Sequence, residues 1–371
     1  MNIRTLTRFG LGLAATAAVL VVAGLLFRTI GQQRIAAQSR IQSALGVESL
    51  ERVTLGGIPQ WILVRGWDRR NPILLFLHGG PGFPETAVAR LFSAELEKHF
   101  TVVHWDQRGA GKSYRFGEDR ASWTIQDYVD DTHALIELLL RRFGKERVFL
   151  VGHSWGTELG LRTAHDHPEL LHAFVGIGQV VHWREQEEIS YRWVVEQARA
   201  TGNTRAQEEL ATIQPPYEHP REMWMERKWL AHFGGDFHDA QGMRRYVLAG
   251  ALSPHYSLLD GLRFAQGIGA PLEMWLNEIR ETDFFRTVPR VEVPVYFFAG
   301  RRDYNTPFQL VERYAETLEA PRKEIVWFER SAHSPNLEEP DRFQEAMVSR
   351  VLAETLATAD ARPLAATPKP R

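Results

Sequence analysis

Short apolar runs without polar alternation recur along the chain, and they constrain its fold more than any other feature. Glycine, proline or charged residues bound these runs, which are too short for core helices. Runs of this kind are typical of strands that are buried on both faces of a parallel sheet. The runs are residues 62–64, 73–77, 101–105, 148–151, 294–299 and 324–328.

Helical spacing appears between the runs. Thr124 and Asp127 form a capping-box pattern, apolar residues then recur at helical spacing as far as Leu139, and Gly144 marks an end. The alternation of strand and helix through about residue 180 predicts a doubly wound α/β domain.

That rhythm stops between residues 181 and 291. This stretch is rich in charged and aromatic residues and contains no strand-like run, so we expect a helical cap inserted into one α/β domain. The core would then comprise residues 51–180 and 292–357. Residues 358–371 contain three prolines and no packing pattern, and we expect a disordered tail.

The N-terminus carries an uncharged stretch of 18 residues, 10–27, with Arg4 and Arg8 before it and Arg28 after it. This length just suffices to cross a bilayer as a helix. We expect residues 1–28 to be a retained membrane anchor and residues 29–50 a linker or short helix; a cleaved signal peptide and a buried soluble helix are the alternatives. The leading arginines favour a catalytic body on the extracytoplasmic side.

Composition excludes several classes of protein. The chain has no cysteine, so it has no disulfide, thiolate metal site or cysteine nucleophile. Its net charge of −2 provides no general attraction for nucleic acid.

A G-x-S-x-G pentapeptide, residues 152–156, directly follows the apolar run 148–151 and precedes a helical pattern. On such a strand-to-helix turn the serine is exposed on a strained backbone, and the helix start directs N–H groups at a developing oxyanion. The sequence therefore makes Ser154 a candidate nucleophile rather than an ordinary turn residue.

A serine hydroxyl needs a base and an orienting acid. Asp303 follows the apolar run 294–299, and His333 follows the run 324–328. Both should lie at the carboxyl edge of the sheet, where open α/β sheets place their sites. We expect His333 to be the general base and Asp303 its partner. The plainer interpretations are a turn or helix-capping residue for Asp303 and a loop histidine for His333.

Residues 78–82, HGGPG, follow the run 73–77 and occupy the place of an oxyanion loop. We expect the backbone N–H groups of Gly80 and Trp155 to form the oxyanion hole, with Gly79 close to the substrate.

Residues 106–113 end like a phosphate-binding loop, but Asp106 stands where the first glycine of such a loop would be. We predict a structural turn there in which Asp106 pairs with Arg108.

Together, HGGPG, DQRGAGKS, GHSWG and the late Asp and His resemble the proline iminopeptidase branch of the α/β-hydrolase family. The resemblance covers about residues 50–180 and 290–355, and His153 departs from its usual GGSWG. It implies a helical cap, no metal, no cofactor, and removal of an N-terminal residue, typically proline, from small peptides. It also implies cap carboxylates that hold the substrate's amino group, for which the candidates are Glu185, Glu188, Glu196, Glu222, Glu226 and Glu273.

Three functions remain open on the sequence. The first is an aminopeptidase on short peptides. The second is a carboxylesterase or lipase-like enzyme for small acyl esters, and the third is a non-catalytic binding protein tethered to a membrane. The expected partners are a small-molecule or short-peptide substrate and, through the N-terminal helix, a membrane; no nucleic-acid partner is expected. The sequence does not determine the oligomeric state.

Overall fold

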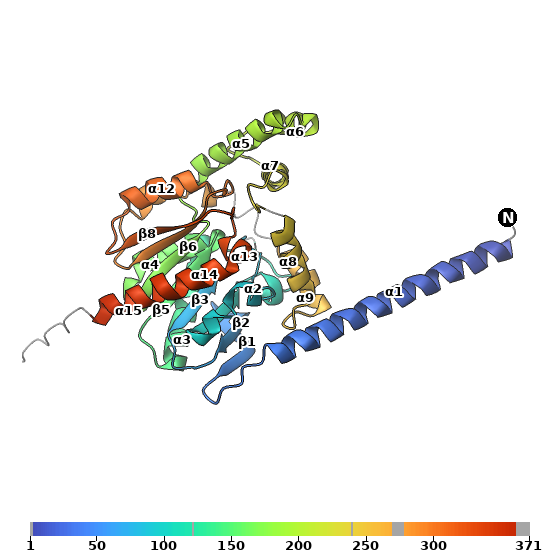
Figure 1. Ribbon diagram of the computed structural model, residues 1–371. Coiled ribbons are helices and arrows are strands. Elements are labelled where there is room, and N and C mark those ends of the chain that lie inside the picture. Colours follow the sequence, from blue (N-terminus) through green and yellow to red (C-terminus); the bar gives the residue numbers. More distant parts are fainter. Residues whose placement is uncertain (1–2, 121, 239, 269–277, 361–371) are drawn as a thin grey trace, which may run out of the picture.

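An eight-stranded sheet forms the centre of the body in the computed structural model, which describes residues 3–120, 122–238, 240–268 and 278–360 (Figure 1). The strand order is β1-β2-β4-β3-β5-β6-β7-β8. β1, β2 and β4 pair antiparallel, and all pairs from β4 onward are parallel. The strands are β1 (Val47–Leu55), β2 (Ile58–Gly66), β3 (Ile73–Leu77), β4 (Thr101–Asp106), β5 (Val148–His153), β6 (Leu171–Ile177), β7 (Val295–Gly300) and β8 (Lys323–Phe328).

Helices cover both faces of this sheet, so the predicted doubly wound α/β fold is confirmed. Alternate residues of β3 show the two faces: Leu75 and Leu77 belong to one hydrophobic cluster, and Leu74 and Phe76 to the other. The first face is covered by α3 (Ile125–Phe143), α4 (Trp155–Asp166) and α12 (Phe308–Thr317). The second face is covered by α2 (Arg90–Ser93), α13 (Pro335–Glu338), α14 (Pro340–Ala346) and the π-helical turn η5 (Met347–Leu352), which continues into α15 (Ala353–Asp360). Short 3₁₀ turns lie at Leu96–Lys98, Gly111–Ser113 and Pro168–Leu170.

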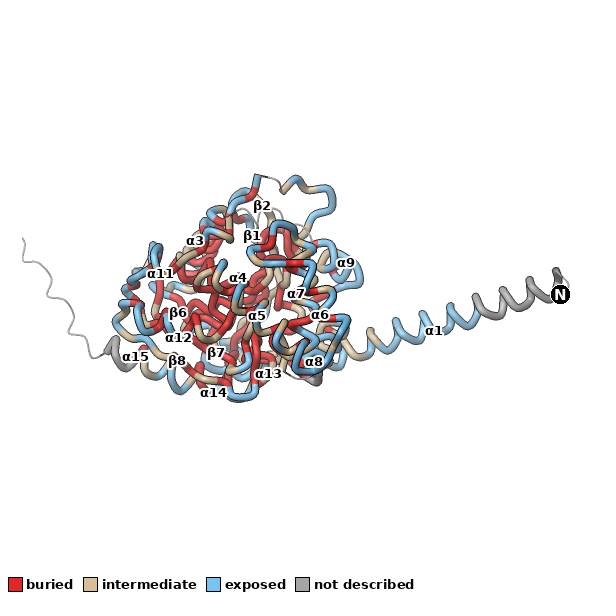
Figure 2. The backbone as a smooth tube through the Cα atoms, turned by 90° about the horizontal axis from the view of Figure 1, so that it is seen from above, coloured by how far each residue is buried: buried red, intermediate tan, exposed pale blue. Residues whose placement is uncertain are grey.

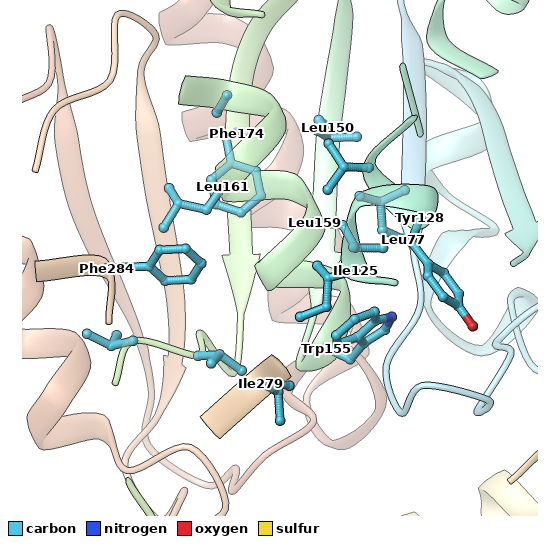
Figure 3. Packing of buried hydrophobic residues seen from close by; sticks show 14 of the residues in the cluster. Leu77, Ile125, Tyr128, Leu150, Trp155, Leu159, Leu161, Phe174, Ile279 and Phe284 are labelled. Atoms are coloured by element: carbon cyan, nitrogen blue, oxygen red, sulfur yellow. The ribbon is translucent and has the colours of Figure 1, made fainter. Parts of the chain in front are cut away.

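The core beneath α3 and α4 reaches the region where β5 ends. Figure 3 shows Trp155, at the start of α4, beside Tyr128 of α3, with Leu77 and Leu159 close by. The rings of Tyr128 and Trp155 meet edge to face, with centroids 5.6 Å apart. Side chains of this size each contribute about 1.5–3 kcal/mol when buried, so they hold the start of α4 firmly against the sheet.

Helix α3 begins and ends as predicted. Thr124 and Asp127 form the reciprocal capping box, and Gly144 ends the helix in the left-handed conformation with φ 61°. The predicted apolar positions Ile125, Tyr128, Val129, Leu135, Ile136 and Leu139 are buried.

A helical cap lies between β6 and β7. It contains α5 (Trp183–Ala200), α6 (Thr204–Leu210), α7 (Pro220–His232), α8 (Ala240–Ala251), α9 (Leu258–Gly267), the 3₁₀ turn η4 (Ile279–Glu281) and α11 (Phe284–Thr287). Its two ends are joined at the base, because Trp183 N donates to Thr282 O at 3.0 Å and Phe284 N donates to Val181 O at 2.9 Å. The predicted candidate Glu273 lies outside the described residues.

The N-terminal helix α1 (Ile3–Gln38) projects from the body as a single long rod (Figures 1 and 2). The predicted linker 29–50 differs from the structure: α1 continues to Gln38, and β1 begins at Val47. The apolar helix does not stop at Arg28 because residues 29–38 are compatible with a helix and nothing there breaks it. Of the predicted tail 358–371, residues 358–360 belong to α15, and the rest lies outside the described residues.

Candidate active site

Ser154 occupies a sharp turn between β5 and α4. Its φ is 53° and its ψ −120°, and among the described residues it alone combines a side chain with a positive φ. A Cβ atom at Gly152 would overlap the backbone of Gly156, and one at Gly156 would overlap the carbonyl of Leu77. Glycine is therefore required on both sides of Ser154, for reasons of space. The predicted strand-turn-helix context of the pentapeptide is confirmed.

Asp303 and His333 meet although they lie on separate loops. Asp303 follows β7, His333 follows β8, and His333 Nδ1 lies 2.9 Å from Asp303 Oδ2. Both side chains are buried. Because Nδ1 faces the carboxylate, Nε2 is left as the nitrogen that can accept a proton.

The Asp303 carboxylate is held by the turn that follows it. Its Oδ1 accepts the backbone N–H groups of Asn305 and Thr306, each at 2.9 Å, and its Oδ2 accepts the Thr306 hydroxyl at 2.7 Å. These bonds fix the orientation of the carboxylate. Burial by itself would lower the pKa of His333, but the adjacent Asp303 carboxylate, with a smaller contribution from Asp236, raises it.

The loop after β3 lies against Ser154. A Cβ atom at Gly79 would come 3.2 Å from Ser154 Cβ, and Gly80 has a φ of 114°, which strongly favours glycine. Gly79, Gly80, Ser154 and Trp155 all line the same cavity.

Gln107 joins the two segments that were predicted to supply the oxyanion hole. Its side-chain amide donates to His78 O at 3.0 Å and accepts from the Trp155 indole N–H at 3.0 Å. Its backbone N–H donates to His78 Nε2 at 3.1 Å. Burial lowers the pKa of His78 to about 4, so the imidazole stays neutral and can accept this bond. The DQRGAGKS segment thus supports the site, a role that the sequence did not reveal.

The predicted pairing of Asp106 with Arg108 is wrong. Asp106 accepts the Lys112 backbone N–H at 2.8 Å and the Tyr256 hydroxyl, whereas Arg108 pairs with Asp131 at 2.7 Å. Asp106 ends β4 and turns toward the cap, while Arg108 extends toward α3. Residues two positions apart therefore bind different segments, and Tyr256 and Asp131 lie 150 and 23 positions away along the chain.

A cavity of about 490 Å³ lies between the sheet edge and the cap. Ser154 and His333 both line it. Much of the remaining wall is apolar and aromatic: Phe83, Val180, Trp183, Met223, Trp224, Phe237, Met243, Tyr246, Phe264 and Ile279.

Glu185, Glu188, Glu196, Glu222 and Glu226, the described cap candidates, are not among the residues that line this cavity. Glu188 and Glu196 are exposed, Glu185 pairs with Arg313, and Glu222 caps its own helix. Glu226 is buried but is engaged by Arg227 and by the Ser190 hydroxyl at 2.7 Å. The structure therefore does not support these glutamates as substrate contacts, because helical periodicity alone does not show which face of a cap helix turns inward.

Two acidic residues that the sequence analysis missed do line the cavity, Glu85 and Asp236. Glu85 is only 5% exposed and binds Nδ1 of His153 with one oxygen, while its Oε2 accepts no hydrogen bond from any described residue. Burial acts to raise the pKa of Glu85, but the neighbouring His153 more than offsets this, and the pKa is lowered. Glu85 is therefore charged at neutral pH.

His153 is the residue that departs from the family's usual elbow. Besides binding Glu85, its Nε2 lies 3.1 Å from His333 O. The unusual residue thus links Glu85 to the loop that carries His333. A signal was present in the sequence, since an ionisable residue had replaced a glycine beside the candidate nucleophile, but its partner could not be found without the fold.

A strained serine turn, a buried histidine-carboxylate pair and a glycine loop around one cavity define the α/β-hydrolase class. The alpha/beta hydrolase family model matches residues 74–346, and the chain belongs to this family. A relative named "Probable aminopeptidase YbaC", from Bacillus subtilis, is 33% identical over 310 residues, which is 80% of this chain and 94% of the relative. The predicted resemblance is thereby confirmed.

Solved structures show the same fold. A proline iminopeptidase from Mycobacterium smegmatis aligns with a TM-score of 0.60 and 22% identity over 84% of this chain and all of that one. A membrane phospholipase A aligns with a TM-score of 0.61 and 20% identity over 96% of this chain and all of that one. Within the described residues, no group of three or more His, Asp or Glu side chains is arranged to hold a metal ion.

Proposed function

We propose that this protein is a serine hydrolase that removes the N-terminal residue of short peptides. The observation that carries the proposal is the buried His333–Asp303 pair, joined at 2.9 Å, whose histidine lines the same cavity as the strained Ser154 turn. The relative named as a probable aminopeptidase, which spans most of the chain, supports the choice of substrate class.

In the proposed reaction, Ser154 Oγ attacks the scissile carbonyl carbon while His333 Nε2 takes the hydroxyl proton. The Gly80 and Trp155 N–H groups donate to the carbonyl oxygen as it becomes negative. Removing one such donor typically costs about 3 kcal/mol of barrier. The tetrahedral adduct collapses, His333 gives the proton to the leaving amine, and an acyl-enzyme remains. Water, deprotonated by His333, then releases the acid and restores the serine.

The substrate's ammonium group needs a carboxylate in a site this buried. Glu85 and Asp236 supply negative charge in the cavity wall, and the free Oε2 of Glu85 can accept a hydrogen bond there. An ionised donor and acceptor make a strong bond at low local dielectric. We therefore assign ammonium recognition to Glu85, with Asp236 as an additional charge, rather than to the cap glutamates.

An esterase for small acyl esters is the second candidate, favoured by the apolar and aromatic cavity wall. The test compares proline p-nitroanilide, its N-acetyl derivative and short-chain p-nitrophenyl esters, with the full-length enzyme in detergent. The aminopeptidase proposal predicts that the free-amine amide is the preferred substrate. Turnover of esters with no action on amides would favour the esterase, and failure of a fluorophosphonate probe to label Ser154 would favour a binding protein.

Two glutamate variants refine this test. Glu85→Gln should raise KM for proline p-nitroanilide by about tenfold or more, because the ammonium group loses a charged partner, and should leave KM for a neutral ester nearly unchanged. Glu196→Gln, at an exposed position of α5, is the matched control and should change neither value. An equal KM effect of Glu85→Gln on both substrates would show that Glu85 only supports the elbow through His153.

We further propose that α1 is a membrane anchor, with the catalytic body outside the cytoplasm. Its segment Ala15–Gln38 is long and apolar enough to cross a bilayer, and none of its most apolar window is buried in the body. A signal sequence meets the same criteria. Persistence of the N-terminal residues in the mature, carbonate-resistant membrane protein would support the anchor, and their removal would refute it.

A further inference from the structure

Helix α9 is oriented unlike an ordinary surface helix, because its charged side chains face the body and its apolar side chains face outward. Its charged residues point toward the body, where Asp260 is buried and pairs with Lys112 at 2.8 Å and with Arg263 at 2.7 Å. Its leucines point outward: Leu258 is 58% exposed and Leu262 is 61% exposed. A helix normally turns its apolar stripe to the core, so the outward leucines indicate a further partner.

Helix α8 extends this apolar area. Val247 and Leu248 are 60% and 56% exposed, and Met243, one turn earlier, is also exposed. Arg244 and Arg245 are exposed on the same helix. Leucine and valine with arginine alongside are typical of helices that lie in a membrane interface, where the apolar side chains enter the lipid and the arginines reach the headgroups.

Helix α1 is bound to the last residue of α8 and to the loop that joins α8 and α9. Arg28 donates to Ala251 O at 3.0 Å and to Tyr256 O at 2.6 Å, and Gln32 also donates to Tyr256 O, at 3.1 Å. The Tyr256 hydroxyl in turn donates to Asp106 at the end of β4. The loop is thus attached to α1 on one side and to the sheet on the other, which fixes the placement of α8 and α9 relative to the rod (Figure 1).

These contacts set the level of the membrane. The uncharged stretch 10–27 ends immediately before Arg28. At 1.5 Å per residue its 18 residues span roughly 27 Å, close to the thickness of the hydrocarbon layer. Arg28 would then lie at the lipid–water boundary, and Leu258, two residues after its partner Tyr256, would lie near the same level.

We propose that Met243, Val247, Leu248, Leu258, Leu259 and Leu262 form a bilayer-contact surface that rests in the membrane crossed by α1. The inference depends on the proposed membrane anchor and goes beyond it, because an anchor alone does not determine which face of the body meets lipid. The bilayer is the occupant because the surface continues from an apolar helix, at the level where that helix leaves the lipid.

The bilayer-contact surface is also close to the catalytic cavity. Phe264 of α9 packs edge to face on Phe83, with ring centroids 5.9 Å apart, and Phe83 follows the glycine loop. Met243 and Phe264 both line the cavity. The helix that meets the lipid therefore also supports the loop beside Ser154, and the cavity lies next to the membrane surface.

The natural absence of cysteine allows a direct test with single-cysteine variants of the full chain. Leu262→Cys and Leu248→Cys report on the surface, and Leu20→Cys reports on the anchor. Glu316→Cys is the matched exposed control, on α12 at the far side of the body from α1 (Figures 1 and 2). Each is labelled with the dye NBD and reconstituted into phosphatidylcholine vesicles that contain a third phosphatidylglycerol, with or without lipids brominated on their acyl chains.

The proposal predicts that bromolipid quenches NBD at positions 20, 262 and 248 by at least twofold, and leaves position 316 unquenched. Quenching at position 20 alone would overturn the bilayer-contact surface while the anchor stands. Emission that is blue-shifted but unquenched at positions 262 and 248 would overturn the bilayer-contact surface, because a second protein copy rather than lipid would then cover these residues. Absence of quenching at position 20 would overturn the anchor and the surface together, and leaves the proposed hydrolase activity untouched.

Discussion

The backbone strain at Ser154 gives a prediction that does not depend on activity. With φ 53° and ψ −120°, Ser154 adopts a conformation that is comfortable only for glycine. Strain of this kind costs about 1–3 kcal/mol. A glycine at the same place would relieve it but would lose about 0.4–1 kcal/mol through the greater freedom of the unfolded chain. The strain exceeds the entropy, so Ser154→Gly should be more stable than Ser154→Ala by about 1 kcal/mol.

The comparison of Ser154→Gly with Ser154→Ala isolates this effect, because both variants lose the hydroxyl of the proposed nucleophile. One kcal/mol is a difference of about fivefold in the unfolding equilibrium constant. For a chain of this size, the thermal midpoint of Ser154→Gly should be about 1–4 °C above that of Ser154→Ala, which tryptophan fluorescence in detergent can measure.

Ser349 provides the matched control. It is exposed and lies in the helical turn η5, so there the order should reverse, with Ser349→Ala more stable than Ser349→Gly by about 0.5–1 kcal/mol. At Ser154 the alanine variant should be the less stable of the two. If Ser154→Ala proved more stable than Ser154→Gly, the strained turn would be absent and the account of the nucleophile would lose its structural basis.

Three further predictions concern the candidate active site, two of them its catalysis and one its stability. Because Asp303 raises the pKa of His333, the protonated, inactive imidazole should persist above pH 6.5, the ordinary pKa of histidine, and kcat/KM should still rise with pH above that point. The Asp303→Asn variant should show this rise in kcat/KM at lower pH, and its kcat should be lower. Gly178→Ala should lower kcat by at least tenfold with little change in KM, because a Cβ atom there would come 2.8 Å from the His333 ring, on a backbone with φ 54°; steady-state kinetics would show an unchanged kcat if the ring had room to move. Gln107→Leu should destabilise the fold by about 2–4 kcal/mol, because it removes the donor to the buried His78 carbonyl and the acceptor of the Trp155 indole N–H, and a loss below 1 kcal/mol in urea denaturation would contradict the bridging role.

The sequence predicted much of the reacting part of the site because that part follows from local rules. A buried strand ends, a turn follows, and the residues on that turn lie at the carboxyl edge of the sheet. This reasoning placed Ser154, Asp303 and His333 at one edge, and the structure joins the last two by a hydrogen bond. The roles of the three residues stay predictions until they are tested.

The contacts around those residues could not be predicted in the same way. Glu85 meets His153 across 68 positions of the chain, and Gln107 meets Trp155 across 48. Nothing in the local pattern near Glu85 distinguishes it from a solvated loop glutamate. The described cap glutamates that were predicted to bind substrate do not line the cavity. The partner of a buried polar group is chosen by the packing of distant segments.

The sequence by itself determined the α/β fold, the inserted cap and the edge of the sheet where the site lies, because strand burial, helix capping and glycine turns act over a few residues. Only the tertiary structure decided which carboxylates enter the cavity, how Gln107 connects the glycine loop to the elbow, and that α9 turns its leucines outward. Those outcomes depend on which faces of separate elements meet, and short-range patterning does not encode the relative orientation of segments that are distant in the chain.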